Sequence, residues 1–207
     1  MAGVIQKPTF APTITGAEIQ VRKTIELNSS ALVILYQAGT TINAVAATIG
    51  ANGALTYGTA IEIINNTQNE EHVDICLIGT DKFAVCYKNA SNFTFAVVCT
   101  VSGTTITLGT GVTMSISLAT TNASICSLGT DKFIVVYKNS SDSLMYAKAA
   151  TVSGTTITVG TVSASMTSRT VGTIFQNGTD KACIFFNDSG SYTLALSLTV
   201  SGTTITL

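Results

Sequence analysis

The sequence contains one histidine, His72, which follows the acidic residues Glu70 and Glu71. An imidazole beside carboxylates can ligate a metal ion, and the two groups can also act as base and acid in catalysis. This is the one charged cluster in the chain, and such a cluster usually belongs to a solvated connection. We therefore interpret residues 69–72 as a link between structural units and predict no metal site.

One carboxylate recurs along the chain, as Asp81, Asp131 and Asp180, each within a Gly-Thr-Asp-Lys segment. A catalytic role would require three identical active sites on short turns, whereas an aspartate in a turn commonly bonds to its own backbone. No nucleophile with a base, zinc-binding helix motif, phosphate loop or calcium loop can be assembled from the remaining residues. The sequence therefore predicts a non-enzymatic protein with no cofactor.

The five cysteines each lie in an apolar, strand-like run, and none forms a Cys-x-x-Cys pair. Free cysteines in such runs behave as small core side chains. We expect reduced thiols in the core, without a disulfide framework or a zinc site, at these positions: Cys76, Cys86, Cys99, Cys126 and Cys183.

The composition of the chain argues against some classes of binding partner. Of the 207 residues, 46% are apolar and only 10% are charged, with a net charge of −1 and no basic segment, so nucleic acid is not expected to bind. The sequence has neither a signal-like start nor an apolar run of about 18 residues, which predicts synthesis in the cytosol and no membrane insertion. The neutral surface, rich in Ser, Thr and Asn, favours an oligomer or a larger assembly.

The elements that position these residues come from an internal repeat. Gly-Thr-Asp-Lys starts at residues 79, 129 and 178, and Val-Ser-Gly-Thr-Thr-Ile-Thr starts at residues 101, 152 and 200. A weaker copy lies upstream, where Tyr57-Gly58-Thr59 aligns with Leu108-Gly109-Thr110. These matches predict an N-terminal arm at 1–20 and one domain at 21–207, with repeats at about 21–59, 73–110, 123–161 and 172–207.

Each repeat predicts four short antiparallel strands. In the third unit these are residues 123–128, 132–138, 143–152 and 155–159, with the second strand apolar on both faces and the fourth alternating. Such a unit of about 50 residues, repeated four times, is typical of β-propeller blades. We predict an all-β, four-bladed β-propeller, and regard β-helical solenoids and separate sandwiches as poorer fits to the unit length. Residues 1–20 could close the ring or reach a neighbouring molecule.

The loops after the second strands differ between units, whereas the other turns are nearly identical. Divergent loops are where binding to a partner can evolve, so we predict a functional face there. It comprises these residues: Lys88, Asn89, Asn92, Lys138, Asn139, Asp142, Asn187, Asp188 and Tyr192. One aromatic position recurs in the second strands, and we expect core packing there, with an aromatic collar around a ligand as the alternative. Its members are Tyr36, Tyr87, Tyr137 and Phe186.

The unit read at residues 129–161, GTDKFxVxYKN…A…TVSGTTITxGT, resembles a propeller-like repeat of bacteriophage structural proteins and microbial surface proteins. The first unit departs most from it, with Asn28-Ser29-Ser30-Ala31 in place of the Gly-Thr-Asp-Lys segment. The resemblance implies a non-enzymatic virion component, such as a tail, fibre or capsid-decorating protein, with other virion proteins as partners. The alternative is a lectin-like module that binds host-surface glycans.

Overall fold

The computed structural model of the protein describes residues 19–65, 73–116, 121–166, 170–187 and 192–207. Within these ranges the chain consists of β-strands and turns, so the predicted all-β fold is confirmed. This part of the chain contains no helix that could span a membrane. Residues 1–18 of the predicted arm and the segment with Glu70, Glu71 and His72 lie outside the described residues.

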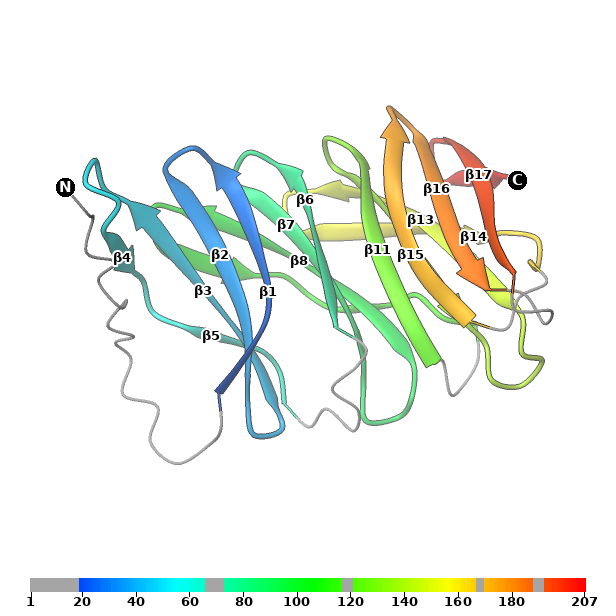
Figure 1. Ribbon diagram of the computed structural model, residues 1–207, viewed down its shortest axis with the longest axis horizontal. Helices are drawn as coiled ribbons and strands as arrows, with labels where there is room; N and C mark the ends of the chain where they lie inside the picture. The colour runs from blue at the N-terminus through cyan, green and yellow to red at the C-terminus, as the bar shows by residue number, and fades with distance from the viewer. Residues whose placement is uncertain (1–18, 66–72, 117–120, 167–169, 188–191) are drawn as a thin grey trace.

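Four antiparallel sheets follow one another along the chain, and we number them sheets 1 to 4 (Figure 1). Sheet 1 comprises β1 (Ile19–Asn28), β2 (Ala31–Ala38), β3 (Thr41–Ile49), β4 (Leu55–Tyr57) and β5 (Ile61–Ile64). Sheet 2 comprises β6 (Asp74–Gly79), β7 (Lys82–Lys88), β8 (Thr94–Ser102), β9 (Thr105–Leu108) and β10 (Val112–Thr113). Sheet 3 comprises β11 (Thr121–Gly129), β12 (Lys132–Lys138), β13 (Met145–Ser153) and β14 (Thr156–Val162). Sheet 4 comprises β15 (Thr170–Gly178), β16 (Lys181–Asn187), β17 (Thr193–Ser201) and β18 (Thr204–Thr206).

The predicted four-stranded units are therefore present, with small differences in their bounds. The second strand of the third unit matches β12, whereas β11 starts at Thr121 and β14 continues to Val162. Sheets 1 and 2 each have a further short strand that the repeat pattern did not predict. These strands, β5 and β10, pair with β3 and β8 along edges that β4 and β9 leave open.

The recurring aspartates lie in turns, as predicted, and two of them, Asp131 and Asp180, also connect neighbouring sheets. Asp131 adopts a left-handed backbone conformation with φ of 58°, which aspartate tolerates better than most residues. Its N–H donates to the Ile78 carbonyl of sheet 2 at 2.8 Å, and its carboxylate accepts from Lys82 Nζ at 2.5 Å. The same two contacts join sheets 3 and 4, through Asp180, Leu128 and Lys132.

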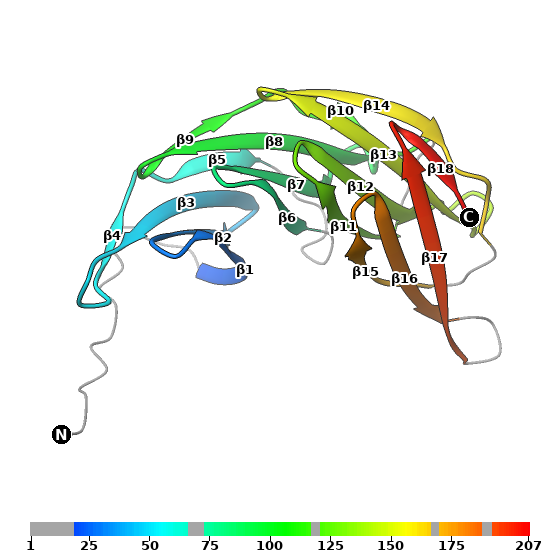
Figure 2. The same ribbon diagram turned by 90° about the horizontal axis from the view of Figure 1, so that it is seen from above.

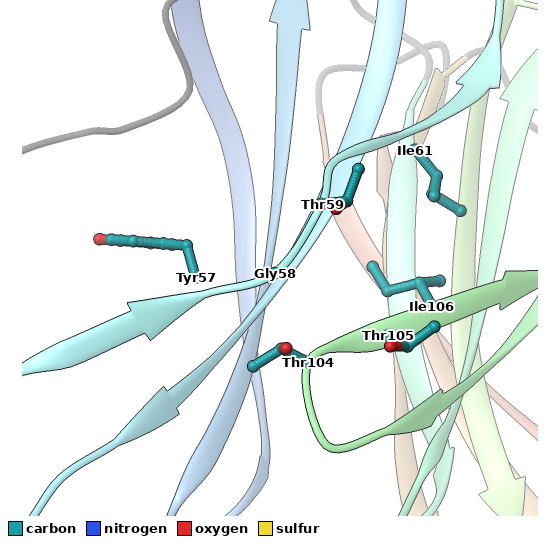
Figure 3. Close-up of a pocket in the computed structure, with 7 residues that line it drawn as sticks. All are labelled: Tyr57, Gly58, Thr59, Ile61, Thr104, Thr105 and Ile106. Atoms are coloured by element: carbon teal, nitrogen blue, oxygen red, sulfur yellow. The ribbon is translucent and has the colours of Figure 1, made fainter.

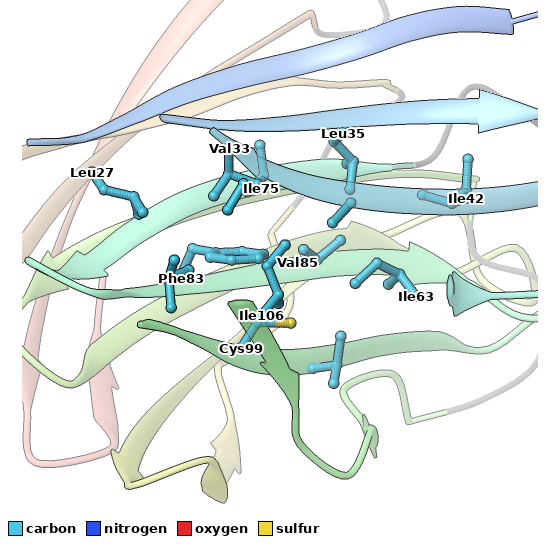
Figure 4. Packing of buried hydrophobic residues seen from close by; sticks show 14 of the residues in the cluster. Leu27, Val33, Leu35, Ile42, Ile63, Ile75, Phe83, Val85, Cys99 and Ile106 are labelled. Atoms are coloured by element: carbon cyan, nitrogen blue, oxygen red, sulfur yellow. The ribbon is translucent and has the colours of Figure 1, made fainter. Parts of the chain in front are cut away.

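Hydrophobic side chains fill the space between each pair of neighbouring sheets. On β12, Phe133, Val135 and Tyr137 belong to the layer shared with sheet 2, while Ile134 and Val136 belong to the layer shared with sheet 4. All five are fully buried, which confirms that the second strand lies between two sheets. Figure 4 shows the corresponding layer between sheets 1 and 2, where side chains of β2 and β3 meet those of β7 and β8.

The four sheets form an arc. The first strand of each sheet contacts the first strand of the next, so that β1, β6, β11 and β15 follow one another along the concave side (Figure 2). Sheets 1 and 4 lie at opposite ends of the row (Figure 1). The described residues therefore form an open arc of four units, and no contact between its two ends closes a ring.

Candidate functional site

A cleft lies between sheets 1 and 2, on the side where β4 and β9 run. It encloses about 440 Å³ between the segment that joins β4 to β5 and the hairpin that joins β8 to β9 (Figure 3). Its lining residues are Tyr57, Gly58, Thr59, Ile61, Thr104, Thr105 and Ile106. The two segments are distant in sequence, so the cleft exists only because the sheets pack side by side.

The two walls of the cleft approach each other closely at Gly58. Its N–H donates to the Ala46 carbonyl at 2.9 Å, which keeps the segment on the edge of β3. A methyl group at this position would overlap the carbonyl oxygen of Thr104, so only glycine permits the hairpin to lie this close. Gly103, with φ of 60°, forms the hairpin turn that brings Thr104 to this point.

This contact between a glycine and the next hairpin recurs along the arc. A methyl group on Gly109 would meet Thr155 of sheet 3, and one on Gly160 would meet Thr203 of sheet 4. In sheets 2, 3 and 4, the hairpin between the third and fourth strands, which we call the outer hairpin, therefore packs against a glycine of the preceding sheet. What differs at the first contact is the residue before the glycine, because Tyr57 stands where the other units have Leu108 and Val159.

The lining of the cleft is polar but uncharged. Thr59, Thr104 and Thr105 supply hydroxyl groups that can donate and accept hydrogen bonds. Tyr57 borders the cleft, but its ring points away from the other lining residues (Figure 3) and packs on the face of sheet 1 that is turned away from sheet 2, against Ile34, Tyr36 and Val45. Ile61 and Ile106 add an apolar patch. Such a surface suits a neutral ligand that is rich in hydroxyl groups, and it contains no carboxylate pair for acid–base catalysis of glycoside hydrolysis.

None of the residues predicted to form the functional face lines this cleft. The loops that follow β7 and β12 lie along one edge of the arc, at the bottom of Figure 1, as the topology predicts. Asn187 accepts a hydrogen bond from the Thr193 hydroxyl at 3.0 Å, and Tyr192 is 69% exposed. Asp188 lies outside the described residues.

In the first of these loops, polar groups serve the turn itself. The Asn89 side-chain oxygen accepts from the Phe93 N–H at 2.9 Å, and Asn92 adopts a left-handed conformation with φ of 64°. Lys88 is only 8% exposed. These contacts explain why the loop carries asparagines without requiring a ligand.

The second loop is built in a similar way. Asn139 is 4% exposed, and its side-chain oxygen accepts from the Ser141 N–H. Asp142 accepts hydrogen bonds from the Leu144 N–H and then from the Tyr146 hydroxyl, and these hold the pKa of its carboxyl below the usual range. The hydrogen bond between Tyr146 and Asp142 also raises the pKa of the Tyr146 hydroxyl. Lys138, which precedes the loop at the end of β12, is half-buried. Whether this face binds a partner stays a prediction.

The recurring aromatic position belongs to the core, as expected. Its four side chains are at most 8% exposed, so they do not form a collar that a ligand could enter; they are Tyr36, Tyr87, Tyr137 and Phe186. The five cysteines are free, and four of them are buried. Among the described residues, no three His, Cys, Asp or Glu side chains lie close enough to hold a metal ion.

Comparison with known proteins supports the fold. No family model and no curated protein matches the chain. A solved fungal lectin from Aleuria aurantia, described as a six-bladed β-propeller with a novel mode of fucose recognition, matches 86% of this chain with a TM-score of 0.55 and 16% identity. A mutant of that lectin in complex with α-methyl-L-fucoside matches the same share, with a TM-score of 0.54 and 15% identity.

These matches show that the chain has a propeller fold, with each sheet corresponding to a blade. The chain spans about 56% of the length of the lectin, as an arc of four blades would within a larger ring. Sequence reasoning predicted the blades but missed the cleft. No pattern within one repeat could show that residues 104–106 lie opposite residues 57–61.

Proposed function

We propose that the chain is a non-catalytic, carbohydrate-binding propeller domain, and that the cleft between sheets 1 and 2 binds a neutral sugar. The observation that carries this proposal is the lining of the cleft, where the hydroxyl groups of Thr59, Thr104 and Thr105 come together beside Ile61. The shared fold with a fucose-binding lectin adds support, since sugar recognition is known on this scaffold.

The chemistry of a sugar explains why this lining is suitable. A pyranose presents hydroxyl groups around its rim and a smaller patch of C–H groups on one face. Thr59, Thr104 and Thr105 can exchange hydrogen bonds with the hydroxyls, and the half-buried side chain of Ile61 can contact the C–H patch. The volume of about 440 Å³ lies within the range of about 300–1,000 Å³ that small-molecule sites occupy.

Calorimetric titration of the full chain with α-methyl-L-fucoside, alongside a panel of neutral glycans, tests the proposal. At least one sugar should bind saturably, and Thr104→Val should weaken that binding about threefold or more because a hydroxyl that bonds to the sugar is lost. Valine has nearly the same shape as threonine and suits a strand end equally well, so the variant should fold normally.

A matched pair of variants separates the cleft from general effects on the fold. Thr59→Val removes a hydroxyl from the cleft, and Thr110→Val removes the equivalent hydroxyl in unit 2, outside the cleft. Only the first should reduce affinity. If no glycan on the panel binds, or if Tyr192→Leu abolishes binding while Thr104→Val leaves it intact, the cleft is not the site.

The predicted place in a virus particle is compatible with glycan binding, because a particle protein can also attach to a host surface. That location is untested and stays a prediction. Mass spectrometry of purified particles would test it.

A further inference from the structure

The outer face of sheet 4, at one end of the arc, exposes two large aromatic side chains. Phe175 of β15 is 41% exposed and Phe185 of β16 is 38% exposed, and their rings stack with centroids 5.5 Å apart. Cys183, two residues before Phe185 on β16, shares this face and is partly exposed. Apolar side chains gathered in this way mark a surface that another molecule covers.

The internal sheets show what covers the equivalent positions. In the repeat, Phe175 corresponds to Cys126 and Phe185 corresponds to Val136. Cys126 is 6% exposed and Val136 is fully buried, because sheet 4 packs on them. The open face of sheet 4 therefore presents the positions that an adjoining propeller sheet buries elsewhere in the arc.

Two polar groups on sheet 4 complete the same docking pattern. Where sheets 3 and 4 meet, the Leu128 carbonyl accepts the Asp180 N–H, and Lys132 binds the Asp180 carboxylate at 2.8 Å. Sheet 4 repeats these groups as the carbonyl of Asn177 and the side chain of Lys181. Lys181 is exposed and has no acidic partner among the described residues.

The other end of the arc does not offer the matching surface. On the outer face of sheet 1, Ile34, Tyr36 and Val45 are at most 8% exposed, so this face is already covered. The first hairpin of sheet 1 also carries Ser30 where the later units have aspartate. Sheet 1 of a second copy therefore supplies neither an open apolar face nor the acidic turn that Lys181 would bind.

We propose that the outer face of sheet 4 docks a further propeller-type blade, supplied by a partner protein, whose first hairpin carries an acidic residue. Phe175, Cys183 and Phe185 form the apolar centre of this interface. Lys181 binds the partner's carboxylate, and the Asn177 carbonyl accepts the N–H of the same partner residue. The interface repeats the one between sheets 3 and 4, with the aromatic rings in place of smaller side chains.

An added unit of known sequence serves as the probe for this face. Leu207 corresponds to Val159 in the repeat, so residues 160–207 appended after Leu207 continue the register and supply an aspartate turn. The added copy of Cys183 is changed to alanine, so that the original Cys183 is the one partly exposed thiol. Its reaction rate with Ellman's reagent should fall about tenfold or more as the added blade covers it.

Charge reversal tests the lysine contact. Changing the aspartate of the added unit to lysine should raise the reaction rate of Cys183 by about twofold or more, and adding Lys181→Glu to that chain should lower it again. A second chain, with residues 109–161 as the added unit and its copy of Cys126 changed to alanine, tests the same face with a different blade in case the first chain folds poorly. Unchanged reactivity of Cys183 in both chains would overturn the proposal.

Self-association is the competing outcome. Light scattering of the original chain reports whether the 21.4 kDa species forms a dimer. A dimer that protects Cys183 and is lost on Phe185→Asp would show that a second copy covers the face, and it would refute the docking of a partner blade. A monomer with a reactive Cys183 agrees with the proposal.

Discussion

Replacing Gly109 by alanine tests the close contact between the outer hairpins and the preceding sheets. Gly109 follows β9 and lies against the hairpin of sheet 3 that contains Thr155. An added methyl carbon would lie 2.7 Å from the Thr155 Cβ and 2.7 Å from the Val98 carbonyl oxygen. Ordinary contact begins at 3.4 Å, so the methyl group overlaps both neighbours by about 0.7 Å.

The overlap is difficult to relieve because the neighbours lie on different sheets. Val98 belongs to β8 of the same sheet as Gly109, and Thr155 belongs to the next sheet, so moving away from one closes the distance to the other. Overpacking of this kind costs about 1–3 kcal/mol, and two rigid backbone neighbours place this variant near the upper value. For a chain of this size, we expect the Tm to fall by about 5–10 °C.

Thermal and urea unfolding, followed by circular dichroism, would measure the effect. Gly79→Ala is the matched control, because its nearest neighbour, the Lys82 Cβ, lies at 3.4 Å and the position lacks the left-handed conformation that penalises alanine. We expect the control to lie within about 1 kcal/mol of the original protein. A Gly109→Ala protein as stable as the control would refute the close contact.

Two further predictions concern thiols and ion pairs. Burial raises the pKa of Cys99 and of Cys126 to about 12, so unfolded thiols ionise from about pH 9 while folded ones stay protonated. The free energy of unfolding should therefore fall between about pH 9 and 12, and changing both residues to alanine should flatten that slope. In a double-mutant cycle of Lys132→Met and Asp180→Asn, the coupling should be below about 1 kcal/mol and shrink in high salt, since both side chains are partly exposed. A coupling that is large and independent of salt would contradict this interpretation.

The blades could be predicted from sequence because the signals that define them are local. The apolar run from Phe133 to Tyr137 fixes a strand buried on both faces, and the glycines and aspartates that flank it fix the turns. Repetition then identifies the same strand in the other units. Each inference needs only residues within one unit of the repeat.

The cleft and the curvature of the arc could not be predicted, because they depend on contacts between units. The overlap that would arise between a side chain at Gly58 and the Thr104 carbonyl follows from how sheets 1 and 2 pack, and no residue spacing reveals it. Asn89 and Asn139 were assigned to a binding face because their loops differ between units, and that assignment stays a prediction. The sequence could not show that both side chains bond within their own loops.

The arrangement of the sheets in an arc determines which parts of the molecule unfold locally first. In the part of the chain that the structure describes, sheets 2 and 3 each pack against two neighbouring sheets, while sheet 4 packs against one. Because contacts run only between adjacent sheets, stability is distributed as in a linear array, where terminal units fray before internal ones. The amides of β17 should therefore exchange with solvent well before those of β12. The cleft borders sheet 2, an internal unit, so one of its walls stays ordered while the far end of the arc unfolds and refolds.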